Sequence, residues 1–565
     1  MTMRARHTAL LLFALSFAMR AVGAPSADLI VRDARIWTVN RGQPEAEAVA
    51  ILNGRFVAVG SEHEIAAWRG PKTVVYDAGG RRLLPGFNDA HVHFASGGAD
   101  LDSVQLNDVT DAAEFARRIA AHAARTPPGD WLQGGNWDET KWPGQALPTH
   151  ALIDAVTEKV PVAIARYDGH MVLTNALAMR LAGITAATPD PPGGLIVRDT
   201  KGNPTGILKD AALDLLTKVI PAPSHEARRG AIEVALRHAA ALGVTSVQDM
   251  NPNFADVAVY AELEKEGHLT TRVYAAPSIS DADAQIHLGL RYAFGSPQLR
   301  LGAVKGYADG SIGSATAYFY EPFLDAPDNR GLLSDEMQPL SLMRDRMTRA
   351  DAAGLQLCTH AIGDAGIAAI LDLYAEIARA HGSKDRRWRI EHAQHMAAAD
   401  FDRFAALGVI ASVQPYHAID DGRWVEARIG HDRASRTYAF RTFLEHGVRL
   451  ALGTDWSVAP LDPMLTLYAA TTRATLDGKH PDGWFAGQKL TVREAIEAYT
   501  MGSAYAEFQD HEKGSIEAGK LADMVLLDRD ILAIDPAQFR SVRVLRTWLG
   551  GRLIFESRGP KPVGR

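Results

Sequence analysis

The sequence predicts an α/β protein: a (β/α)8 TIM-like barrel with an inserted subdomain, joined to a small β-sandwich built from both termini. Three observations lead to this prediction. Short apolar strands alternate with helical stretches through the middle of the chain, as in parallel βα units. Strand-rich segments occupy both ends of the chain. The length of 565 residues, 47% of them hydrophobic and 22% charged, supplies core material for more than one domain.

Residues 1–24 have the pattern of a secretory signal peptide. Arg4 and Arg6 precede an apolar run of 11 residues at positions 9–19, and small residues follow at positions 21–24. The run is shorter than the ~20 residues that span a bilayer comfortably. We therefore expect a periplasmic or secreted protein with no membrane attachment after cleavage. An uncleaved anchor or a misassigned start is the open alternative.

Residues 25–84 and 508–565 are predicted to form one composite β-sandwich domain. In the first segment, Asn53-Gly54 lies between two apolar runs, which is the pattern of a two-residue hairpin turn. In the second segment, Gly550-Gly551 separates two further strand candidates. Residues 85–507 are then left for the barrel.

The barrel prediction depends on eight apolar segments, with helical stretches such as 224–242 and 365–380 between them. The first and second of these segments are much farther apart than a βα connection requires. We therefore predict that residues from about 100 to 223 form an inserted subdomain, which leaves from the end of the barrel where active sites lie. The eight predicted strands are 83–93, 244–250, 271–277, 299–309, 355–360, 388–392, 409–415 and 449–455.

Charge and cysteine content exclude several classes of function. The chain has 60 Lys and Arg against 67 Asp and Glu, so no basic surplus exists to neutralise nucleic-acid phosphates. The single cysteine, Cys358, excludes an internal disulfide and any cysteine-based zinc site. A metal must therefore be held by histidines and carboxylates. We expect a small-molecule substrate and no nucleic-acid partner, with a homodimer as one open arrangement.

Five residues at predicted strand ends form a candidate metal centre. His91 and His93 are two residues apart on the first strand, so their side chains point to the same side. His360, His392 and Asp455 each end a later strand. The carboxyl ends of barrel strands converge on one mouth, and imidazole suits zinc and its neighbours. A single strand-end histidine is more often structural, but four histidines and one aspartate together at strand ends predict a metal site.

Longer motifs surround these strand ends. They are Leu84-Pro-Gly-Phe-Asn-Asp-Ala-His-Val-His93, Arg166-Tyr-Asp-Gly-His170, Val304-Lys-Gly-Tyr-Ala-Asp-Gly-Ser-Ile-Gly313, Thr359-His-Ala-Ile-Gly-Asp364, Arg389-Ile-Glu-His-Ala-Gln394, Gly453-Thr-Asp-Trp456 and Gly514-Ser-Ile-Glu-Ala-Gly-Lys-Leu-Ala-Asp523. Together they make the chain similar to the amidohydrolase superfamily. The resemblance is specifically to the amidohydrolase-3 group, which contains the YtcJ-like proteins and N-substituted formamide deformylase. It covers almost all of the chain after the signal.

The resemblance implies that Lys305, on the fourth strand, joins the four histidines and Asp455 in binding one or two divalent metal ions. Zinc is the metal we expect. It further implies that Lys305 is carbamylated, which gives an anionic ligand able to bridge two metals. A partly buried lysine can react in this way because burial lowers its pKa and exposes a neutral amine. An unmodified Lys305 paired with Asp309 or with a substrate anion is the alternative.

This ligand set predicts a metal-dependent hydrolase. A bound metal lowers the pKa of water from about 15.7 towards ~7 and polarises a carbonyl oxygen. By the resemblance, Asp455 takes a proton from this water and passes it to the leaving nitrogen, unless it is only a ligand. His170, in the insertion, would hold the substrate carbonyl or the oxyanion, unless it is a buried structural residue.

Aromatic residues close to these motifs are candidates for substrate binding. We predict that Trp137, Trp456 and Tyr318 line an apolar pocket beside the metal, together with Phe319 and Tyr320. Aromatic side chains belong more often to the core, and a core position is the alternative for each of them.

The predicted activity is hydrolysis of a C–N bond, other than a peptide bond, in an amide, formamide or cyclic amide. Ester or lactone hydrolysis, deamination and decarboxylation are alternatives at the same centre, because fold and ligands do not determine the substrate. A metal-binding regulatory protein without catalysis is a remote alternative. Such a protein would be expected to lack a ligand or Asp455, and neither is missing.

Overall fold

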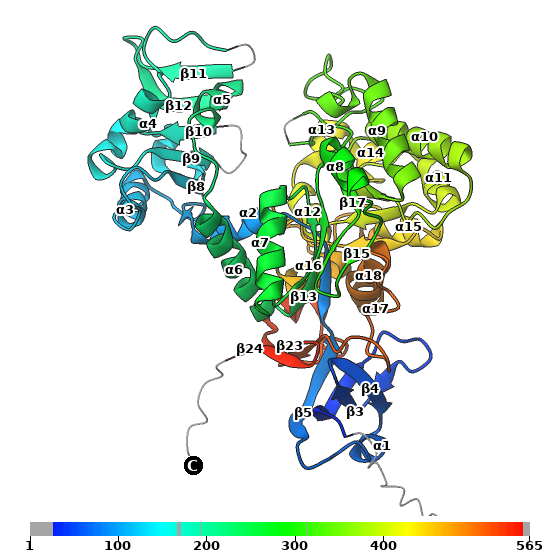
Figure 1. Cartoon of the computed structure of the whole chain (residues 1–565). Helices are drawn as coiled ribbons and strands as arrows, with labels where there is room; N and C mark the ends of the chain where they lie inside the picture. The colour runs from blue at the N-terminus through cyan, green and yellow to red at the C-terminus, as the bar shows by residue number, and fades with distance from the viewer. Residues whose placement is uncertain (1–25, 167–170, 192–193, 314, 558–565) are drawn as a thin grey trace, which may run out of the picture.

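The computed structural model describes residues 26–166, 171–191, 194–313 and 315–557. Figure 1 shows a central α/β part, a sheet below it that contains both ends of the described chain, and a subdomain set to one side. No helix in these four segments is long and apolar enough to cross a membrane.

Eight parallel strands form the central part. They are β6 (Phe87–Val92), β13 (Val244–Met250), β14 (Arg272–Ala276), β17 (Ala303–Tyr307), β18 (Gln356–Ala361), β19 (Arg389–His392), β20 (Ile410–Val413) and β21 (Leu450–Leu452). Each overlaps one of the eight predicted segments. They pair in chain order within two sheets. Bridges from Ser278 to Lys305 and from Val92 to Trp456 join the sheets at both junctions, so the strands close into a ring of the barrel type.

The sequence of these strands suits burial on both faces. All seven residues of β13 are buried, as are all six of β6, which is typical of parallel strands covered by helices. Two short strands, β15 (Phe294–Gly295) and β16 (Leu299–Leu301), extend the first sheet beside β14.

Helices surround the strands and begin and end at recognisable signals. α6 (His225–Ala241) starts after Ser224, whose side chain accepts the N–H of Ala227. α9 (Leu340–Ala353) ends at Gly354, whose φ of 83° suits glycine. The other helices of this part are α2 (Phe94–Asp102), α7 (Phe254–Lys265), α8 (Ala282–His287), α10 (Asp364–His381), α11 (Asp400–Leu407), α12 (Pro415–Asp421), α13 (Val425–Ile429), α14 (His431–Ala434), α15 (Phe440–Glu445), α16 (Pro463–Thr472), α17 (Val492–Glu497) and α18 (Ser503–Ala506).

Strands from both ends of the chain share one sheet. β5 (Val74–Pro85) pairs in parallel with β1 (Leu29–Trp37) and antiparallel with β22 (Met524–Leu527). The remaining strands of the sheet are β2 (Glu45–Ala46), β3 (Ala48–Leu52), β4 (Arg55–Gly60), β23 (Val544–Leu549) and β24 (Arg552–Glu556), and the short helix α1 (Glu62–Ala66) follows β4. Because β5 is hydrogen-bonded on both edges, the strands predicted as a sandwich form one continuous eight-stranded mixed sheet.

The insertion has its own sheet and its own core. Its sheet has the order β11-β12-β10-β9-β8-β7, and its two apolar clusters are separate from that of the barrel. In Figure 1 it lies beside the barrel, and α2 and α6 lead to and from it and pack on each other. Its elements are β7 (Val104–Gln105), α3 (Ala112–Ala123), β8 (Leu132–Trp137), β9 (Val162–Arg166), β10 (Met171–Thr174), α4 (Ala176–Leu181), β11 (Gly194–Arg198), β12 (Pro204–Asp210) and α5 (Asp214–Thr217).

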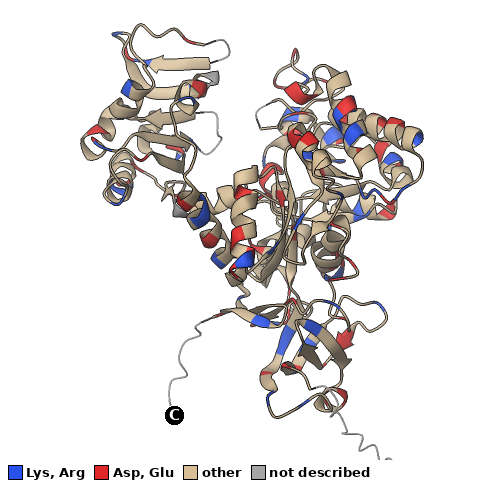
Figure 2. Ribbon diagram, in the orientation of Figure 1, with Lys and Arg blue, Asp and Glu red and all other residues tan. Residues whose placement is uncertain are grey.

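Charged residues of both signs are interspersed. Figure 2 shows Lys and Arg alternating with Asp and Glu, mainly on the helices and loops, while the barrel strands carry few of either. This distribution is that of an ordinary globular surface.

Candidate metal centre

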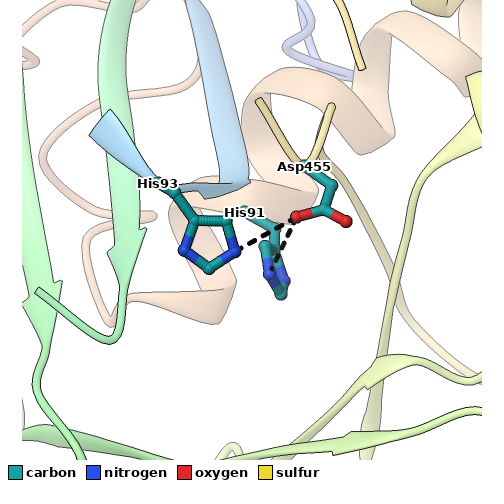
Figure 3. Close-up of side chains that lie close together, drawn as sticks. All are labelled: His91, His93 and Asp455. Atoms are coloured by element: carbon teal, nitrogen blue, oxygen red, sulfur yellow. Dashed lines mark ion pairs between the residues drawn. The ribbon is translucent and has the colours of Figure 1, made fainter. Parts of the chain in front are cut away.

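Two histidines of the first barrel strand meet an aspartate that follows the last one (Figure 3). His91 is in β6, His93 follows the end of that strand, and Asp455 lies just beyond β21. The Nε2 atoms of His91 and His93 are 3.5 and 3.3 Å from Asp455 Oδ1. The structure therefore brings these three predicted ligands together at the carboxyl ends of the strands.

Hydrogen bonds of the backbone connect the ends of the first and last barrel strands. The N–H of Asp455 donates to the carbonyl of His91 over 2.8 Å. The buried Asp89 carboxylate accepts the N–H of His91 and of Thr454, and the hydroxyl of Tyr499 donates to its other oxygen. The first and last strands are thus held in register directly behind the three side chains.

Two of the candidate ligands have left-handed backbone conformations. The φ angle is 62° at Asp455 and 72° at His392, in a region that non-glycine residues seldom adopt. Each such conformation costs ~1–3 kcal/mol and is typically retained at functional sites. The surrounding hydrogen bonds therefore hold both residues where their side chains reach the mouth of the barrel.

The spacing of the polar atoms fits a bound cation. Zinc bound to nitrogen at about 2.0–2.1 Å in a tetrahedron separates its ligand atoms by about 3.3–3.4 Å. The separations of 3.3 and 3.5 Å match this value and exceed the usual ~2.9 Å of an N–H···O hydrogen bond. Asp455 Oδ1 is buried and accepts no hydrogen bond from any described group. His91, His93 and Asp455 form one group able to hold a metal ion.

Burial keeps His91, His360 and His392 neutral, as metal binding requires. Burial, assisted by Lys305, lowers the pKa of His91 to about 4, although Glu391 opposes the shift. Burial and Lys305 likewise lower the pKa of His360 to about 3. The pKa of His392 is also far below its usual value, because of burial and the neighbouring rings. Near neutral pH these imidazoles are therefore uncharged, and each has a nitrogen lone pair that can bind a metal ion.

Three of the rings are held through Nδ1. His91 Nδ1 lies 2.7 Å from Glu391 Oε2, His93 Nδ1 lies 2.9 Å from the carbonyl of Met250, and His392 Nδ1 lies 2.8 Å from Gln414 Oε1. Such contacts select the tautomer whose Nε2 lone pair faces the metal.

His360 has the opposite orientation. Its Nε2 lies 3.1 Å from the carbonyl oxygen of Gly310, which leaves Nδ1 as the nitrogen for a ligand. Its ring centroid is 4.6 Å from that of His392, which is in turn 4.8 Å from that of His91. All four predicted histidines are therefore neighbours.

Lys305 is buried beside the first of these histidines. Its Nζ is 3.4 Å from His91 Nε2 and the residue is buried, so burial lowers its pKa although Glu391 and Asp455 oppose this. Asp309, the partner suggested for an unmodified Lys305, instead accepts the N–H groups of Tyr318, Ile362 and Gly363. That alternative pairing is wrong for this structure, because the carboxylate is used by the backbone.

One residue of the centre escaped sequence analysis. His417, in α12, places Nε2 3.2 Å from Asp455 Oδ2, and it forms a second possible metal-holding group with His392 and Asp455. It comes four residues after the end of β20, the seventh barrel strand. A search for histidines shortly after every strand, and not only at strand ends, would have found it.

Two predicted pocket residues lie in cores instead. Trp137 is fully buried in the insertion, beside Phe115, and its Nε1–H donates to the carbonyl of Ile164. Trp456 is 5% exposed and is packed between Phe94 and His238. The prediction that these rings line the substrate pocket is therefore corrected: their apolar area is already used for packing.

The remaining predicted residues have different outcomes. Tyr318 is half-buried, next to the buried Phe319 and the exposed Tyr320, and its N–H holds Asp309. His170 lies outside the described residues.

Comparison with known proteins now identifies the family. Residues 74–555 match the family model described as the amidohydrolase family. The chain belongs to the amidohydrolase family. The resemblance inferred from the motifs is confirmed, and it makes this protein one of a family of metal-dependent hydrolases. Its structure contains groups of His and Asp side chains that could hold a metal ion.

Relatives of this amidohydrolase span nearly its whole length. Protein LONG AFTER FAR-RED 3 of Arabidopsis thaliana is 37% identical over 94% of this chain and 92% of its own. YtcJ of Bacillus subtilis is 29% identical over 92% of this chain and 98% of its own. N-substituted formamide deformylase of Arthrobacter pascens is 29% identical over 94% of this chain and 99% of its own.

A solved structure resembles this amidohydrolase in fold. An uncharacterized metal-dependent hydrolase from Pyrococcus furiosus has a TM-score of 0.74 and 28% identity, covering 89% of this chain and 99% of that chain.

Proposed function

We propose that this amidohydrolase cleaves a C–N bond, other than a peptide bond, in a small amide, formamide or cyclic amide. The observation that carries the proposal is Asp455 Oδ1, a buried carboxylate oxygen that faces two histidine nitrogens and accepts no hydrogen bond from a described group. A proton acceptor beside a metal site is what hydrolysis by water needs. The likeness to a formamide deformylase supports a C–N bond over an ester.

The donor atoms favour zinc. Imidazole nitrogens from His91 and His93 and a carboxylate oxygen from Asp455 suit zinc better than magnesium or calcium, which prefer oxygen ligands. A bound zinc ion would supply a water of lowered pKa and polarise the substrate carbonyl.

Asp455 moves the proton in this mechanism. The side chains of His417 and His93 hold the pKa of Asp455 far below its usual value against the effect of burial, so the carboxylate is anionic at neutral pH. Its Oδ1 accepts a proton from the attacking water as the carbonyl carbon becomes tetrahedral. The same oxygen then returns the proton to the leaving nitrogen, because an unprotonated amine anion is a poor leaving group.

Lys305, His360 and His392 would extend the site to two ions. The buried Lys305 has a lowered pKa, so its neutral amine can add to carbon dioxide and release one proton, which leaves a carbamate. The contacts of His360 Nε2 and His392 Nδ1 leave His360 Nδ1 and His392 Nε2 as the nitrogens that a metal would use. We include carbamylated Lys305 in the proposal as an anionic side chain that would help to hold the metal.

In this proposal, residues of the insertion and of the loop after β17 orient the substrate. We propose that His170 holds the substrate carbonyl or the oxyanion, and that Tyr318 lines the entrance. The N-terminal pattern supports export to the periplasm or the medium, where the substrate would be met.

An activity screen tests the proposal. Purified protein, with its zinc content measured, is given N-formyl, N-acyl, cyclic imide and ester substrates. We expect turnover of at least one C–N substrate, and a loss of about 10²–10⁴-fold in kcat for Asp455→Asn at equal zinc content. Asp420→Asn, on α12 but outside the centre, is the control. Ester turnover alone, or an active Asp455→Asn, would contradict the proposal.

A further inference from the structure

The seventh barrel strand, β20, supplies none of the predicted metal ligands, yet two side chains that follow it contact ligands. Gln414 is the residue after β20, and its Oε1 lies 2.8 Å from His392 Nδ1. His417 lies one turn further on, and its Nε2 is 3.2 Å from Asp455 Oδ2. One short segment therefore contacts ligands from the sixth and from the eighth strand.

The contacts of Gln414 hold the imidazole ring of His392 in one orientation. The residue is fully buried, and its Nε2 points to the carbonyl of Ser412, which directs Oε1 toward His392. An acceptor at Nδ1 requires the proton to be on Nδ1, so the lone pair is on Nε2. The contact also supports the left-handed backbone of His392, whose φ is 72°.

His417 contacts the second of these ligands, Asp455. The terminal torsion of an aspartate has broad, roughly two-fold minima, so one contact to one oxygen does not determine the plane of the carboxylate. Asp455 Oδ1 faces His91 and His93, while His417 is the described side chain that hydrogen-bonds to Oδ2. A donor on the outer oxygen fixes that plane and keeps Oδ1 aimed at the metal site.

Helix α12 places His417 for this role. Pro415 opens the helix directly after Gln414, at a position where a missing N–H costs nothing, so the chain turns from strand to helix within one residue. His417 is then in the first turn, with its side chain 15% exposed and its Nε2 facing inward.

We propose that the segment from Gln414 to His417 is a positioning element of the metal centre, in which Gln414 fixes the ring of His392 and His417 fixes the carboxylate plane of Asp455. The inference rests on the proposed function, since it concerns the same centre. Neither residue needs to touch the metal or the substrate. Each acts through a ligand, so each should be replaceable by a side chain that keeps the same hydrogen bond.

Paired substitutions test both contacts. His417→Leu removes the donor at similar size, whereas His417→Gln keeps an N–H at a similar distance from the backbone. Gln414→Leu removes the acceptor, and Gln414→Glu keeps it. Zinc affinity is measured by competition with a chromophoric chelator, and site geometry by the visible spectrum of the cobalt(II)-substituted protein. Unfolding of each metal-free variant reports on folding.

The two leucine variants should bind zinc about 10–100-fold more weakly and change the cobalt spectrum. His417→Gln and Gln414→Glu should stay within about threefold of wild type. Tyr416→Phe, on the same turn, is the control and should behave as wild type. Metal-free unfolding curves that match wild type exclude a general loss of structure; a leucine variant that misfolds is replaced by His417→Met or Gln414→Met.

Two results would overturn the inference. The first is a leucine variant with wild-type zinc affinity and an unchanged cobalt spectrum. The second is a glutamine variant at position 417 that binds as weakly as the leucine variant, because a hydrogen bond would then not be the cause. A wild-type protein that binds neither ion would instead remove the proposed function itself, which separates the two failures.

Discussion

His91 shows how a single ligand depends on buried charge behind it. Its Nδ1 contacts Glu391, and Glu391 forms an ion pair with Arg389 over 2.8 Å, all three fully buried inside the barrel. Burial would raise the pKa of Glu391, but Arg389 and His91 keep it far below its usual value. The innermost ligand of the centre is therefore supported by a buried carboxylate whose charge Arg389 balances.

We expect Glu391→Gln to destabilise the protein strongly. The substitution leaves the Arg389 guanidinium buried without its counter-charge, which costs about 3–5 kcal/mol in the free energy of unfolding. Urea unfolding at neutral pH measures this. Glu376→Gln is the control, because Glu376 pairs with Arg344 at the surface and should change stability by less than about 1 kcal/mol. Equal effects of the two substitutions would contradict the assignment.

Among the elements, helix α2 depends on close contact with the loop that carries Asp455. A Cβ atom on Gly97 would lie 2.5 Å from the ring of Trp456, so only glycine allows the helix this close. The N–H of His93 also donates to the carbonyl of Trp456. The start of α2, the second histidine and the loop after β21 therefore form one packed unit.

Gly97→Ala should push α2 away from Trp456. Overpacking of this kind costs about 1–3 kcal/mol, and it should also weaken zinc binding because Asp455 is next to the displaced ring. Gly230→Ala, in α6, is the matched control, since its Cβ meets nothing within 4 Å and removal of a helical glycine gains about 0.5–1 kcal/mol. Thermal unfolding compares the two; a stabilised Gly97→Ala protein would refute the contact.

Ion pairs of Asp351 hold helix α9 in place, so their contribution to the free energy of unfolding depends on pH. Asp351 is 3% exposed in its side chain and contacts His381, Lys384 and Arg386. Burial raises its pKa, but Arg386, His381 and Lys384 together lower it below the usual value. The folded protein therefore favours the ionised carboxylate.

Asp351→Asn should lower the free energy of unfolding by about 1.5–3 kcal/mol at neutral pH. Because the folded pKa is depressed, the stabilisation by Asp351 is present above the unfolded pKa of about 3.9 and is lost as the pH falls through the folded value. The gap between wild type and variant should thus close on acidification below about pH 4. Urea titrations from pH 7 to pH 3 measure it, and a gap that widens toward low pH would show the sign to be wrong.

In the whole molecule, the metal centre, the barrel and the terminal sheet are mechanically connected. Only Gly86 lies between β5 of the sheet and β6, which carries His91. Arg272 of β14 forms a buried ion pair with Asp523, just before β22, over 2.7 Å. The sheet from both termini is therefore fixed to the barrel at the strand that supplies the first ligand.

Zinc should raise the unfolding temperature of the whole protein. A ligand that binds only the folded chain stabilises it by ~2.7 kcal/mol at a free concentration of 100 times Kd. We expect chelator treatment to lower Tm and zinc to restore it, while magnesium should not, because the donors include histidine nitrogens. The zinc-dependent shift should shrink in Asp455→Asn. A Tm independent of zinc would contradict the metal centre.

The strand pattern and most of the centre were predictable from sequence for physical reasons. Fully buried parallel strands read as continuous apolar runs, and His91, His93 and Asp455 are at their ends. His417 follows the seventh strand by only four residues, so a wider search around strand ends could have found it, whereas the role of Gln414 was not predictable because it depends on how α12 starts. Trp137 was misplaced, because composition does not distinguish a core ring from a pocket ring.

Local sequence pattern also could not predict that the terminal strands form one continuous sheet. The pairing of β5 with β22 joins segments from opposite ends of the chain. Alternating polarity identifies each strand, but it does not specify which distant strand becomes its neighbour. The prediction of a composite domain followed from the strand-rich termini, whereas the continuity of the sheet required the structure.

The position of β5 between β1 and β22 has a consequence for biosynthesis. One edge of β5 acquires its partner early, but the other waits for β22, which is encoded near the end of the message. At ~5–20 residues per second, the roughly 440 residues between them take about 20–90 s to translate. During that interval the nascent chain displays an unpaired strand edge next to the histidine strand, so the growing polypeptide needs protection from self-association until its last strands arrive.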